Sequence, residues 1–272
     1  MITLGIIGDE RVVHSLSPRM HNAVMAKLGL DGVYARFAVE PQNMAAAIAG
    51  IKALGLAGVN VTVPHKRAVL PCLARLSDEA AALGAVNTIK SEADGLAGYN
   101  TDMDGFSLAL SEARFQAEGA TALVLGAGGA ARAVVLALVR GGAQVMVAAR
   151  KLAQSTALCN ELGGKGISLE QAAAVLPEVS LVVNATSVSA PDESPEMMAW
   201  IEAHPPDAKL ALVMDINYGR QQNMWKQLAR KNQAAFMDGL PMLAHQARLS
   251  FQLWTGIETS VDDFKAALEK AS

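Results

Sequence analysis

The chain has 272 residues, of which 51% are apolar and 18% are charged, so it can bury a large core and is not expected to be disordered. Its net charge of −3 argues against a nucleic-acid-binding protein that relies on phosphate neutralisation. The sequence contains no uninterrupted run of about 18 apolar residues, so we expect no membrane span. The N-terminus lacks the basic start of a signal peptide. Cys72 and Cys159 have no CxxC spacing and predict neither a disulfide framework nor a zinc site. We therefore expect a folded cytoplasmic protein.

The first hundred residues alternate between strand-like and helix-like segments. Pro18 suits the first turn of a helix, and Pro71 marks the start of a longer helical stretch. The alternation favours a largely parallel sheet with helices on its faces. The expected strands cover residues 2–8, 33–39, 59–63, 86–89 and 96–99, and the expected helices cover residues 18–28, 44–54 and 68–83.

A second alternating series begins near residue 121, after a helix-like bridge over residues 102–119. Because the bridge separates two such series, we place a domain boundary there. The chain is then an α/β protein with one domain at residues 1–103 and another at residues 104–237. The expected strands of the second series cover residues 122–125, 145–148, 181–183 and 210–216, with Met237 closing the set, and helices are expected over residues 239–253 and 261–268.

A glycine-rich turn follows the first strand of the second series. The stretch LVLGAGGAARAVV, residues 123–135, fits the GxGxxA pattern with Gly126, Gly128 and Ala131. Gly126 permits a tight turn, Gly128 lets backbone N–H groups approach a pyrophosphate, and Ala131 lets the helix pack closely on the sheet. An ordinary tight turn is the alternative, but the strand–turn–helix context favours a Rossmann-type dinucleotide site.

The next strand ends in two cations, Arg150 and Lys151, rather than in an acidic residue. An acid at this point would accept a hydrogen bond from the ribose 2′-hydroxyl of NAD, whereas basic side chains suit a 2′-phosphate. Two solvated loop cations are the alternative. The position of the pair at this strand end favours NADP as the cofactor.

Polar side chains gather at the ends of several apolar elements in the first half. Ser15 and Ser17 precede a helix, and with Pro18 at its first position Ser17 is expected to be the N-cap. Asn87 and Asn100 have the alternative role of turn residues. His14, His21 and His65 share no metal-ligand spacing, so we assign no metal site.

Lys66 and Asp102 are the pair with the clearest chemical meaning. An exposed ion pair is one explanation of these residues. If they share a site, Lys66 is a candidate general base or acid toward a substrate hydroxyl, and Asp102 positions it. Spacing alone does not decide between the two.

The motifs, taken in order, resemble those of the shikimate/quinate dehydrogenases over residues 5–256. The resemblance rests on the following stretches: SLSP at 15–18 with His21 and Asn22, NVTVPHK at 60–66, GAVNT at 84–88, NTD at 100–102 with Gly105, GAGGA at 126–130, NATS at 184–187, and GLPML at 239–243 with Gln246.

The resemblance implies an N-terminal substrate domain, residues 1–103, completed by residues 238–272, and a Rossmann-type NADP-binding domain at residues 104–237. It implies reversible NADP-dependent oxidation of shikimate to 3-dehydroshikimate, with Lys66 and Asp102 as the proton-transfer pair. The substrate-binding residues implied are Ser15, Ser17, Asn60, Thr62, Asn87, Tyr218 and Gln246. The cofactor-binding residues implied are Gly126, Ala127, Gly128, Gly129, Ala130, Arg150, Lys151, Thr186, Ile216 and Gly239.

Three stretches depart from the family pattern. The usual Asn-Arg-Thr is Ala149-Arg150-Lys151, the segment after Tyr218 is GRQQ, and the first loop reads DERVV at residues 9–13. These departures leave open a divergent paralogue that prefers quinate or a related cyclic hydroxy acid, and a nucleotide-binding sensor without turnover. A methylene-tetrahydrofolate-type dehydrogenase does not explain the SLSP motif. We expect a monomer or homodimer that binds a small molecule, with no nucleic-acid or membrane partner.

Overall fold

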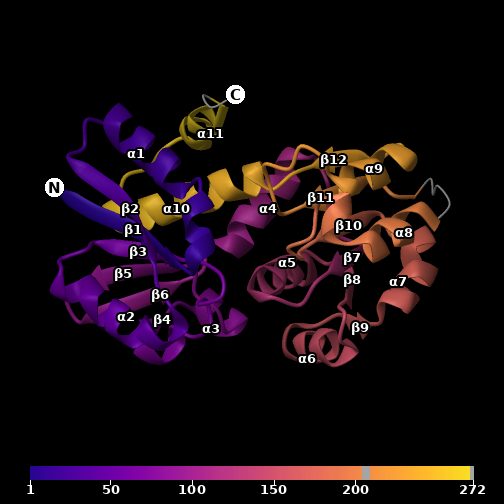
Figure 1. Ribbon diagram of the computed structural model, residues 1–272, viewed down its shortest axis with the longest axis horizontal. Coiled ribbons are helices and arrows are strands. Elements are labelled where there is room, and N and C mark those ends of the chain that lie inside the picture. The colour runs from indigo at the N-terminus through magenta and orange to yellow at the C-terminus, as the bar shows by residue number, and fades with distance from the viewer. Residues whose placement is uncertain (204–208, 270–272) are drawn as a thin grey trace. The chain divides into compact units, whose positions relative to one another are not determined.

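The computed structural model describes residues 1–203 and 209–269, and residues 270–272 of the expected C-terminal segment lie outside this part. The chain folds into two compact units, Met1–Gly105 with Leu243–Ser272, and Phe106–Met242 (Figure 1). The predicted α/β fold with C-terminal helices returning to the first domain is confirmed. The predicted functional boundaries at residues 103/104 and 237/238 stay predictions. No helix in the described residues has the length and apolar character needed to cross a membrane.

The first unit contains a mixed sheet with strand order β2-β1-β3-β5-β6-β4. β1, β2 and β3 are parallel, but β5 and β6 form an antiparallel hairpin, and β5 also runs antiparallel to β3. Three of the five pairings in this sheet are parallel, so the expectation of a largely parallel sheet holds for only part of this unit. The two-residue link at 93–94 between β5 and β6 is too short for a crossover and produces a hairpin. Its strands are β1 (Ile2–Gly8), β2 (Gly32–Ala38), β3 (Gly58–Val61), β4 (Arg75–Leu76), β5 (Thr88–Glu92) and β6 (Gly95–Tyr99).

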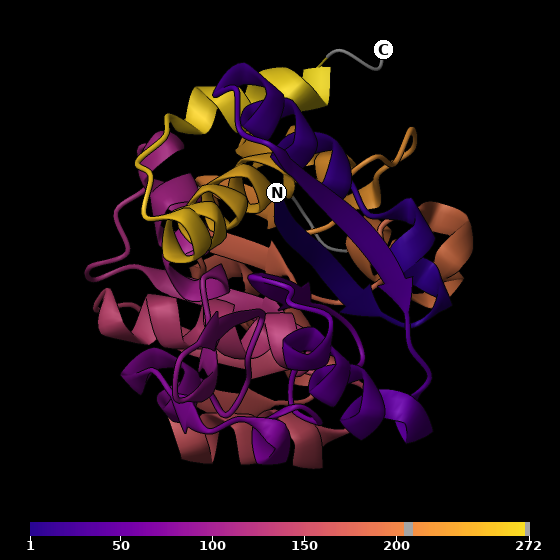
Figure 2. The same cartoon turned by 90° about the vertical axis from the view of Figure 1, so that its left-hand side faces the viewer.

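Helices cover both faces of this sheet. One buried cluster joins α1, α10 and α11 to β1 and β2, and another joins α2 and the segment before α3 to β1 and β3. Figure 2 shows α11 lying beside α1. Residues of α10 and α11 therefore form one buried core with residues of α1, β1 and β2. The helices of this unit are α1 (Ser17–Lys27), α2 (Met44–Ala53), α3 (Asp78–Leu83), most of α10 (Leu240–Thr255) and α11 (Val261–Glu269), with 3₁₀ turns η1 (Glu10–His14), η2 (Pro41–Asn43) and η3 (Leu70–Cys72).

The helix expected over residues 68–83 was wrong. Only its last turns, α3, are α-helical, and Ser77 begins them by accepting the N–H of Ala80. Upstream, Pro71 lies in the 3₁₀ turn η3, and residues 75–76 form β4 against β6. Strand pairing and the missing N–H of proline therefore overrode the helical pattern.

The second unit contains an all-parallel sheet with strand order β12-β11-β10-β7-β8-β9. The chain first builds outward from β7 to β9 and then returns to build outward from β10 to β12, so the topological switch point lies between β7 and β10. This is the dinucleotide-binding order of the Rossmann fold. Its strands are β7 (Thr121–Leu125), β8 (Gln144–Ala148), β9 (Lys165–Ile167), β10 (Leu181–Asn184), β11 (Leu212–Asp215) and β12 (Ala235–Met237).

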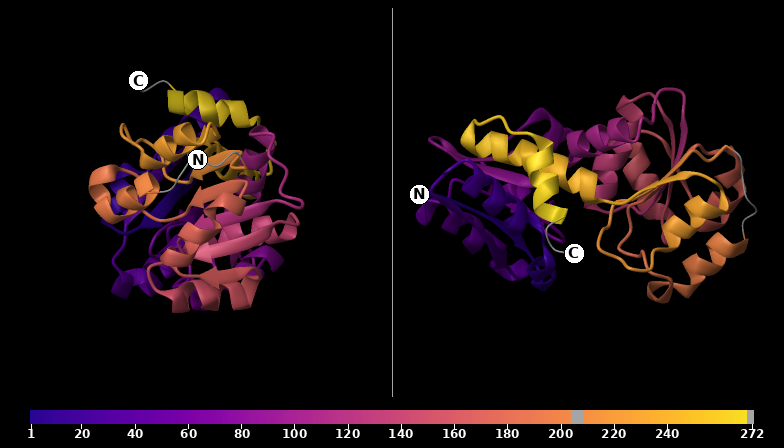
Figure 3. Two further views of the ribbon diagram at one scale, coloured as in Figure 1. Left: turned by 90° about the vertical axis from the view of Figure 1, so that its right-hand side faces the viewer. Right: turned by 90° about the horizontal axis from the view of Figure 1, so that it is seen from above.

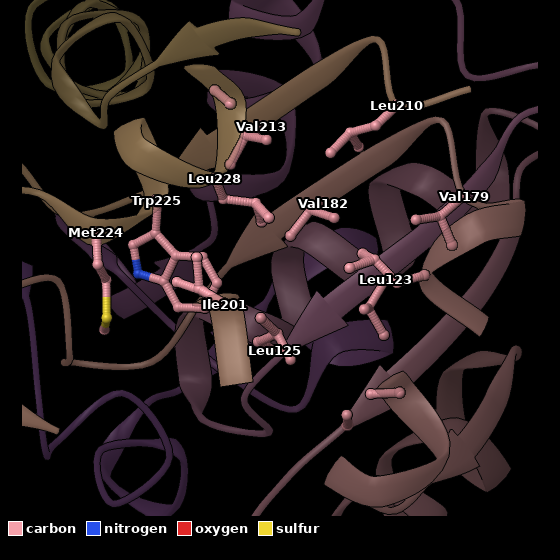
Figure 4. Packing of buried hydrophobic residues seen from close by; sticks show 14 of the residues in the cluster. Leu123, Leu125, Val179, Val182, Ile201, Leu210, Val213, Met224, Trp225 and Leu228 are labelled. Atoms are coloured by element: carbon pink, nitrogen blue, oxygen red, sulfur yellow. The ribbon is translucent and has the colours of Figure 1, made fainter. Parts of the chain in front are cut away.

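The core of the second unit lies between this sheet and the helices of its second half. Trp225 and Leu228 are fully buried against Val182 and Val213 (Figure 4), and Figure 3 shows helices on both faces of the sheet. Side chains of β7 and β10 thus fix the strands whose ends carry the expected cofactor residues. The helices are α4 (Asp102–Glu112), α5 (Gly129–Arg140), α6 (Leu152–Leu162), α7 (Leu169–Val175), α8 (Pro195–Ala203) and α9 (Met224–Lys231), with 3₁₀ turns η4 (Leu176–Glu178) and η5 (Pro191–Glu193).

Candidate active site and cofactor site

Lys66 and Asp102, 36 positions apart in the chain, form an ion pair in the first unit. Lys66 lies in the turns that follow β3, and Asp102 is the first residue of α4. Lys66 Nζ donates to Asp102 Oδ2 at 2.5 Å, and the two side chains are 13% and 8% exposed. The pair is thus mostly withdrawn from water, unlike the exposed ion pair that the sequence left open.

Asn87 fixes the other oxygen of the same carboxylate. Its Nδ2 donates to Asp102 Oδ1 at 2.8 Å and to Thr101 Oγ1 at 2.9 Å, and its Oδ1 accepts the Thr101 N–H at 2.8 Å. The backbone N–H of Asp102 donates to Asn100 Oδ1 at 3.0 Å. Both carboxylate oxygens of Asp102 therefore have defined partners, one a cation and one an amide. The predicted contact between Asn87 and substrate stays a prediction.

Asn60, on β3, is 4% exposed and belongs to the same hydrogen-bond network through Asn87. Its Nδ2 donates to the Asn87 carbonyl at 3.0 Å, and its Oδ1 accepts the hydroxyl proton of Tyr34 at 2.6 Å. Burial raises the pKa of Tyr34 well above its ordinary value, so the phenol remains a donor. The Asn60 side chain forms hydrogen bonds with other protein groups. The expected role of Asn60 in substrate binding stays a prediction.

The two serines of the SLSP motif lie at the start of α1, where Leu16 is the N-cap. Ser17 is the first residue of α1, and Ser15 Oγ accepts its backbone N–H at 3.2 Å. The expectation that Ser17 is the N-cap was wrong, because the helix begins one residue earlier than Pro18 alone suggests. Ser15 remains partly exposed, whereas Ser17 is 4% exposed.

Thr62 and Gln246 complete the expected residues of the first unit. Thr62 follows β3, half-buried, and its N–H donates to Ile7 O at 2.8 Å. Gln246 projects from α10 and donates to Leu243 O at 2.8 Å, with its Oε1 3.5 Å from Asn87 Nδ2. The structure thus brings Gln246 beside the Lys66–Asp102 network, from 144 positions further along the chain than Asp102.

His21 is held as a neutral aromatic ring in the core of the same unit. It stacks on Tyr34 with ring centroids 4.3 Å apart, and neither ring nitrogen has a hydrogen-bond partner among residues 1–203 and 209–269. Burial lowers the pKa of His21 to about 3. In the described part of the chain no three metal-ligating side chains are grouped.

In the second unit the expected cofactor residues follow five parallel strands at one edge of the sheet. Gly126 has φ +110, and a Cβ there would approach Ala185 O to 2.7 Å, so only glycine lets the turns after β7 and β10 meet. Gly128 is the N-cap of α5, and open space surrounds the position that its Cβ would take. The N–H groups of Gly129 and Ala130 begin this helix and have no partner within it, which suits a phosphate.

The remaining members of this set lie on neighbouring strand ends. Arg150 and Lys151 are exposed directly after β8. Thr186 follows β10 and donates through Oγ1 to Asn184 Oδ1 at 2.7 Å. A Cβ on Gly239 would meet Ile216 O at 2.1 Å, so glycine is required where the chain returns past β11. Ala127, within the glycine turn, is partly exposed.

A buried carboxylate that no sequence motif indicated joins these turns. Asp215, fully buried at the end of β11, accepts from Asn184 Nδ2 at 2.8 Å, from Asn217 Nδ2 at 3.0 Å and from Asn223 Nδ2 at 2.7 Å. Asn217 Nδ2 also donates to Thr186 O at 2.8 Å, so the turns after β10 and β11 are joined. The spacing of these asparagines has no short-range pattern from which the cluster could have been inferred.

Asp238 precedes Gly239 at the end of β12, and it too was missed. Burial raises its pKa, and the Asp215 carboxylate adds to that effect, while the N–H of Leu240 donates to it at 3.0 Å. Tyr218 follows β11, partly buried. Its predicted role near a substrate carboxylate stays a prediction.

Three family models match most of the chain. Residues 6–89 match the model of the shikimate dehydrogenase substrate binding domain, residues 107–238 that of shikimate / quinate 5-dehydrogenase, and residues 239–269 that of the shikimate 5'-dehydrogenase C-terminal domain. The chain belongs to the shikimate dehydrogenase family. The resemblance inferred from the motifs is therefore confirmed.

Individual members of the family are similar over nearly the full length. A shikimate dehydrogenase (NADP(+)) from Geobacter metallireducens is 41% identical over 266 residues, which cover 94% of this chain and 91% of the relative. The crystal structure of shikimate dehydrogenase from Aquifex aeolicus matches with a TM-score of 0.91 and 35% identity, covering 99% of this chain and 98% of that one. The Thermus thermophilus enzyme in complex with NADP(H) and shikimate matches with a TM-score of 0.88 and 34% identity over 100% of both chains.

Proposed function

We propose that this protein is an NADP-dependent shikimate dehydrogenase that reversibly oxidises shikimate to 3-dehydroshikimate. The observation that carries the proposal is the largely buried Lys66–Asp102 pair, in a chain whose relatives are named for this activity and cofactor. The alternatives with quinate as the better substrate or with no turnover are not favoured by these relatives.

Oxidation of a secondary alcohol removes a hydride from carbon and a proton from oxygen. NADP⁺, when bound, supplies the hydride acceptor. The substrate hydroxyl gives its proton to Lys66 Nζ as the general base, and Asp102, whose Oδ2 lies 2.5 Å from that nitrogen, positions the amine and stabilises the ammonium that forms. In the reverse direction the same pair returns that proton to the carbonyl oxygen.

The remaining polar groups of the first unit hold the substrate. Ser15 and Ser17 supply hydroxyls at the start of α1 for the substrate carboxylate, and Thr62 and Gln246 supply a hydroxyl and an amide for the ring hydroxyls. Tyr218 is proposed to contact the carboxylate, while Asn60 and Asn87 complete the polar surface around the pair.

The second unit is proposed to hold NADP by three features. The glycine turn, Gly126–Ala130, leaves room for the pyrophosphate at the N-terminus of α5. Arg150 and Lys151 neutralise the 2′-phosphate through charge-assisted hydrogen bonds. Thr186, Ile216 and Gly239 line the edge of the sheet on the other side of the switch point.

The test is steady-state kinetics with shikimate and NADP⁺, followed through the absorbance of the reduced nicotinamide. Lys66→Ala is expected to lower kcat by about 10²- to 10⁴-fold, because general acid–base catalysis contributes that much, with a smaller change in the KM for shikimate. Lys52→Ala, at an exposed lysine of α2, is the matched control and should leave kcat unchanged. Near-normal turnover of the Lys66 variant would contradict the assignment, and cofactor binding without turnover by the wild type would favour the sensor.

A further inference from the structure

Ser250, a fully buried residue of α10, contacts three side chains of the first unit's sheet region. Its Oγ lies 2.8 Å from Thr88 Oγ1, 3.1 Å from Thr101 Oγ1 and 3.1 Å from Asn60 Nδ2. None of the sequence motifs includes Ser250. A hydroxyl with three polar neighbours in a fully buried position constrains the direction of each hydrogen bond.

The shorter contacts of this cluster favour one assignment of donors and acceptors. Asn87 Nδ2 donates to Thr101 Oγ1, and that hydroxyl lies 3.1 Å from Ser250 Oγ and 3.3 Å from Asn87 Oδ1, so the shorter contact directs its proton to Ser250. Thr88 donates to Asn87 Oδ1 at 2.9 Å, so between Ser250 and Thr88 the proton belongs to Ser250. The hydrogen bonds therefore run from Thr101 to Ser250, from Ser250 to Thr88, and from Thr88 to Asn87 Oδ1.

This order of bonds matches one orientation of the Asn87 carboxamide. Its oxygen receives the Thr88 proton and the Thr101 N–H, so its NH₂ group must face Asp102. A flipped carboxamide would place an oxygen against the Asp102 carboxylate and an NH₂ group against the Thr88 proton, because Ser250 and Asn60 Nδ2 already occupy the acceptor positions of Thr88 Oγ1. Both contacts would be repulsive in a buried site.

We infer that Ser250 is a positioning residue, which acts through Thr88 to hold the Asn87 NH₂ group toward Asp102 and so keeps the Lys66–Asp102 pair aligned. The structural part of this inference rests on the hydrogen bonds alone, whereas its effect on turnover rests on the proposed function. A serine that merely filled space or satisfied Asn60 would affect stability but not the orientation of Asn87.

The test compares Ser250→Ala and Thr88→Val, singly and together, with Ser260→Ala. Ser260 is an exposed serine whose hydroxyl accepts the N–H of Asp262 at 3.2 Å, so its variant also loses a local hydrogen bond. Each of the first two substitutions is expected to lower kcat by about 2- to 12-fold, the value of one hydrogen bond, with the shikimate KM changed by less. The double variant should be no slower than the slower single variant, because both substitutions break one chain of bonds.

Thr88→Ser, which keeps the hydroxyl, should recover most of the kcat lost in Thr88→Val. Because the Thr88→Val and Thr88→Ser comparison leaves Ser250 unchanged, it still tests the inference if Ser250→Ala folds poorly. Additive effects on kcat in the double variant, or an unchanged kcat in both single variants, would overturn the inference. So would a loss in Ser260→Ala equal to that in Ser250→Ala.

A second readout does not need turnover. The side-chain amide resonances of Asn87, identified by their loss in Asn87→Asp, are expected to shift or broaden in Ser250→Ala and Thr88→Val and to stay in place in Ser260→Ala. If the wild type fails to oxidise shikimate but these resonances move, the proposed function fails and the positioning role stands. If the wild type turns over and the resonances do not move, the positioning role fails and the function stands.

Discussion

His21 provides a measurable link between burial and stability. The folded protein holds the ring neutral because burial lowers its pKa to about 3, whereas in the unfolded chain its pKa is about 6.5. Between these values the unfolded state binds the additional proton, so the free energy of unfolding must fall as the pH falls. At about pH 5 the loss attributable to His21 is about 2 kcal/mol, and at about pH 7.5 it is close to zero.

The assay compares wild type with His21→Phe by urea unfolding at both pH values. Phenylalanine keeps the stacking on Tyr34 and cannot bind a proton. The difference in unfolding free energy between the two proteins should therefore shift by about 2 kcal/mol in favour of the variant on going from about pH 7.5 to about pH 5. Groups other than His21 titrate alike in both proteins and cancel in this difference.

His14→Gln is the matched control, because His14 is exposed in the 3₁₀ turn η1. Its replacement should leave the pH dependence of unfolding as it is in the wild type. An equal pH dependence in wild type and His21→Phe would refute the reasoning, since it would mean that the folded protein protonates His21 without penalty.

Three further predictions concern the second unit. Arg150→Ala should raise the Kd for NADP, measured by calorimetry, about 10-fold or more and leave that for NAD nearly unchanged, because one charge-assisted contact to the 2′-phosphate is lost; equal losses for both cofactors would contradict the phosphate role. Gly126→Ala should abolish measurable NADP binding and lower Tm, since its Cβ would meet Ala185 O at 2.7 Å at a φ of +110; unchanged binding would argue against the close approach of the two turns. Asn223→Ala should lower the unfolding free energy by about 1–3 kcal/mol, because it removes the cap of α9 and a donor to buried Asp215; a change below about 0.5 kcal/mol in a denaturant titration would show that water replaces both contacts.

Structure was predictable from the sequence where a residue type or a run of residues suits only one local structure. The glycine turn was predictable because only glycine adopts the φ of Gly126 beside a neighbouring backbone. The second sheet was predictable because buried parallel strands are continuous apolar runs, as in LVV at residues 181–183. The residues 68–83 misled, because their alanine and leucine content suits a helix while Pro71 and pairing with β6 decide otherwise.

In the candidate site, too, some residues were indicated by sequence motifs and others were not. Lys66 and Asp102 were recognisable as a pair through family motifs, but spacing alone left a surface ion pair open. Ser250 and Asp215 carried no signal, because a serine on an apolar helix and an aspartate at a strand end are ordinary in sequence. Their importance comes from distant hydrogen-bond partners. The partners of Ser250 lie 149 to 190 positions earlier in the chain, and Asn184, which donates to Asp215, lies 31 positions earlier on β10.

By itself the sequence determined the α/β class, the glycine turn, the basic strand end and the family, since each depends on residues close together in the chain or on motifs in a fixed order. Only the tertiary structure decided that the first sheet is mixed, that Ser15 rather than Ser17 accepts the first N–H of α1, and that α10 closes the hydrogen bonds around Asn87. The physical reason is that buried hydrogen bonds must be satisfied by whichever group folding brings near, and that group is set by the packing of distant elements rather than by neighbouring residues.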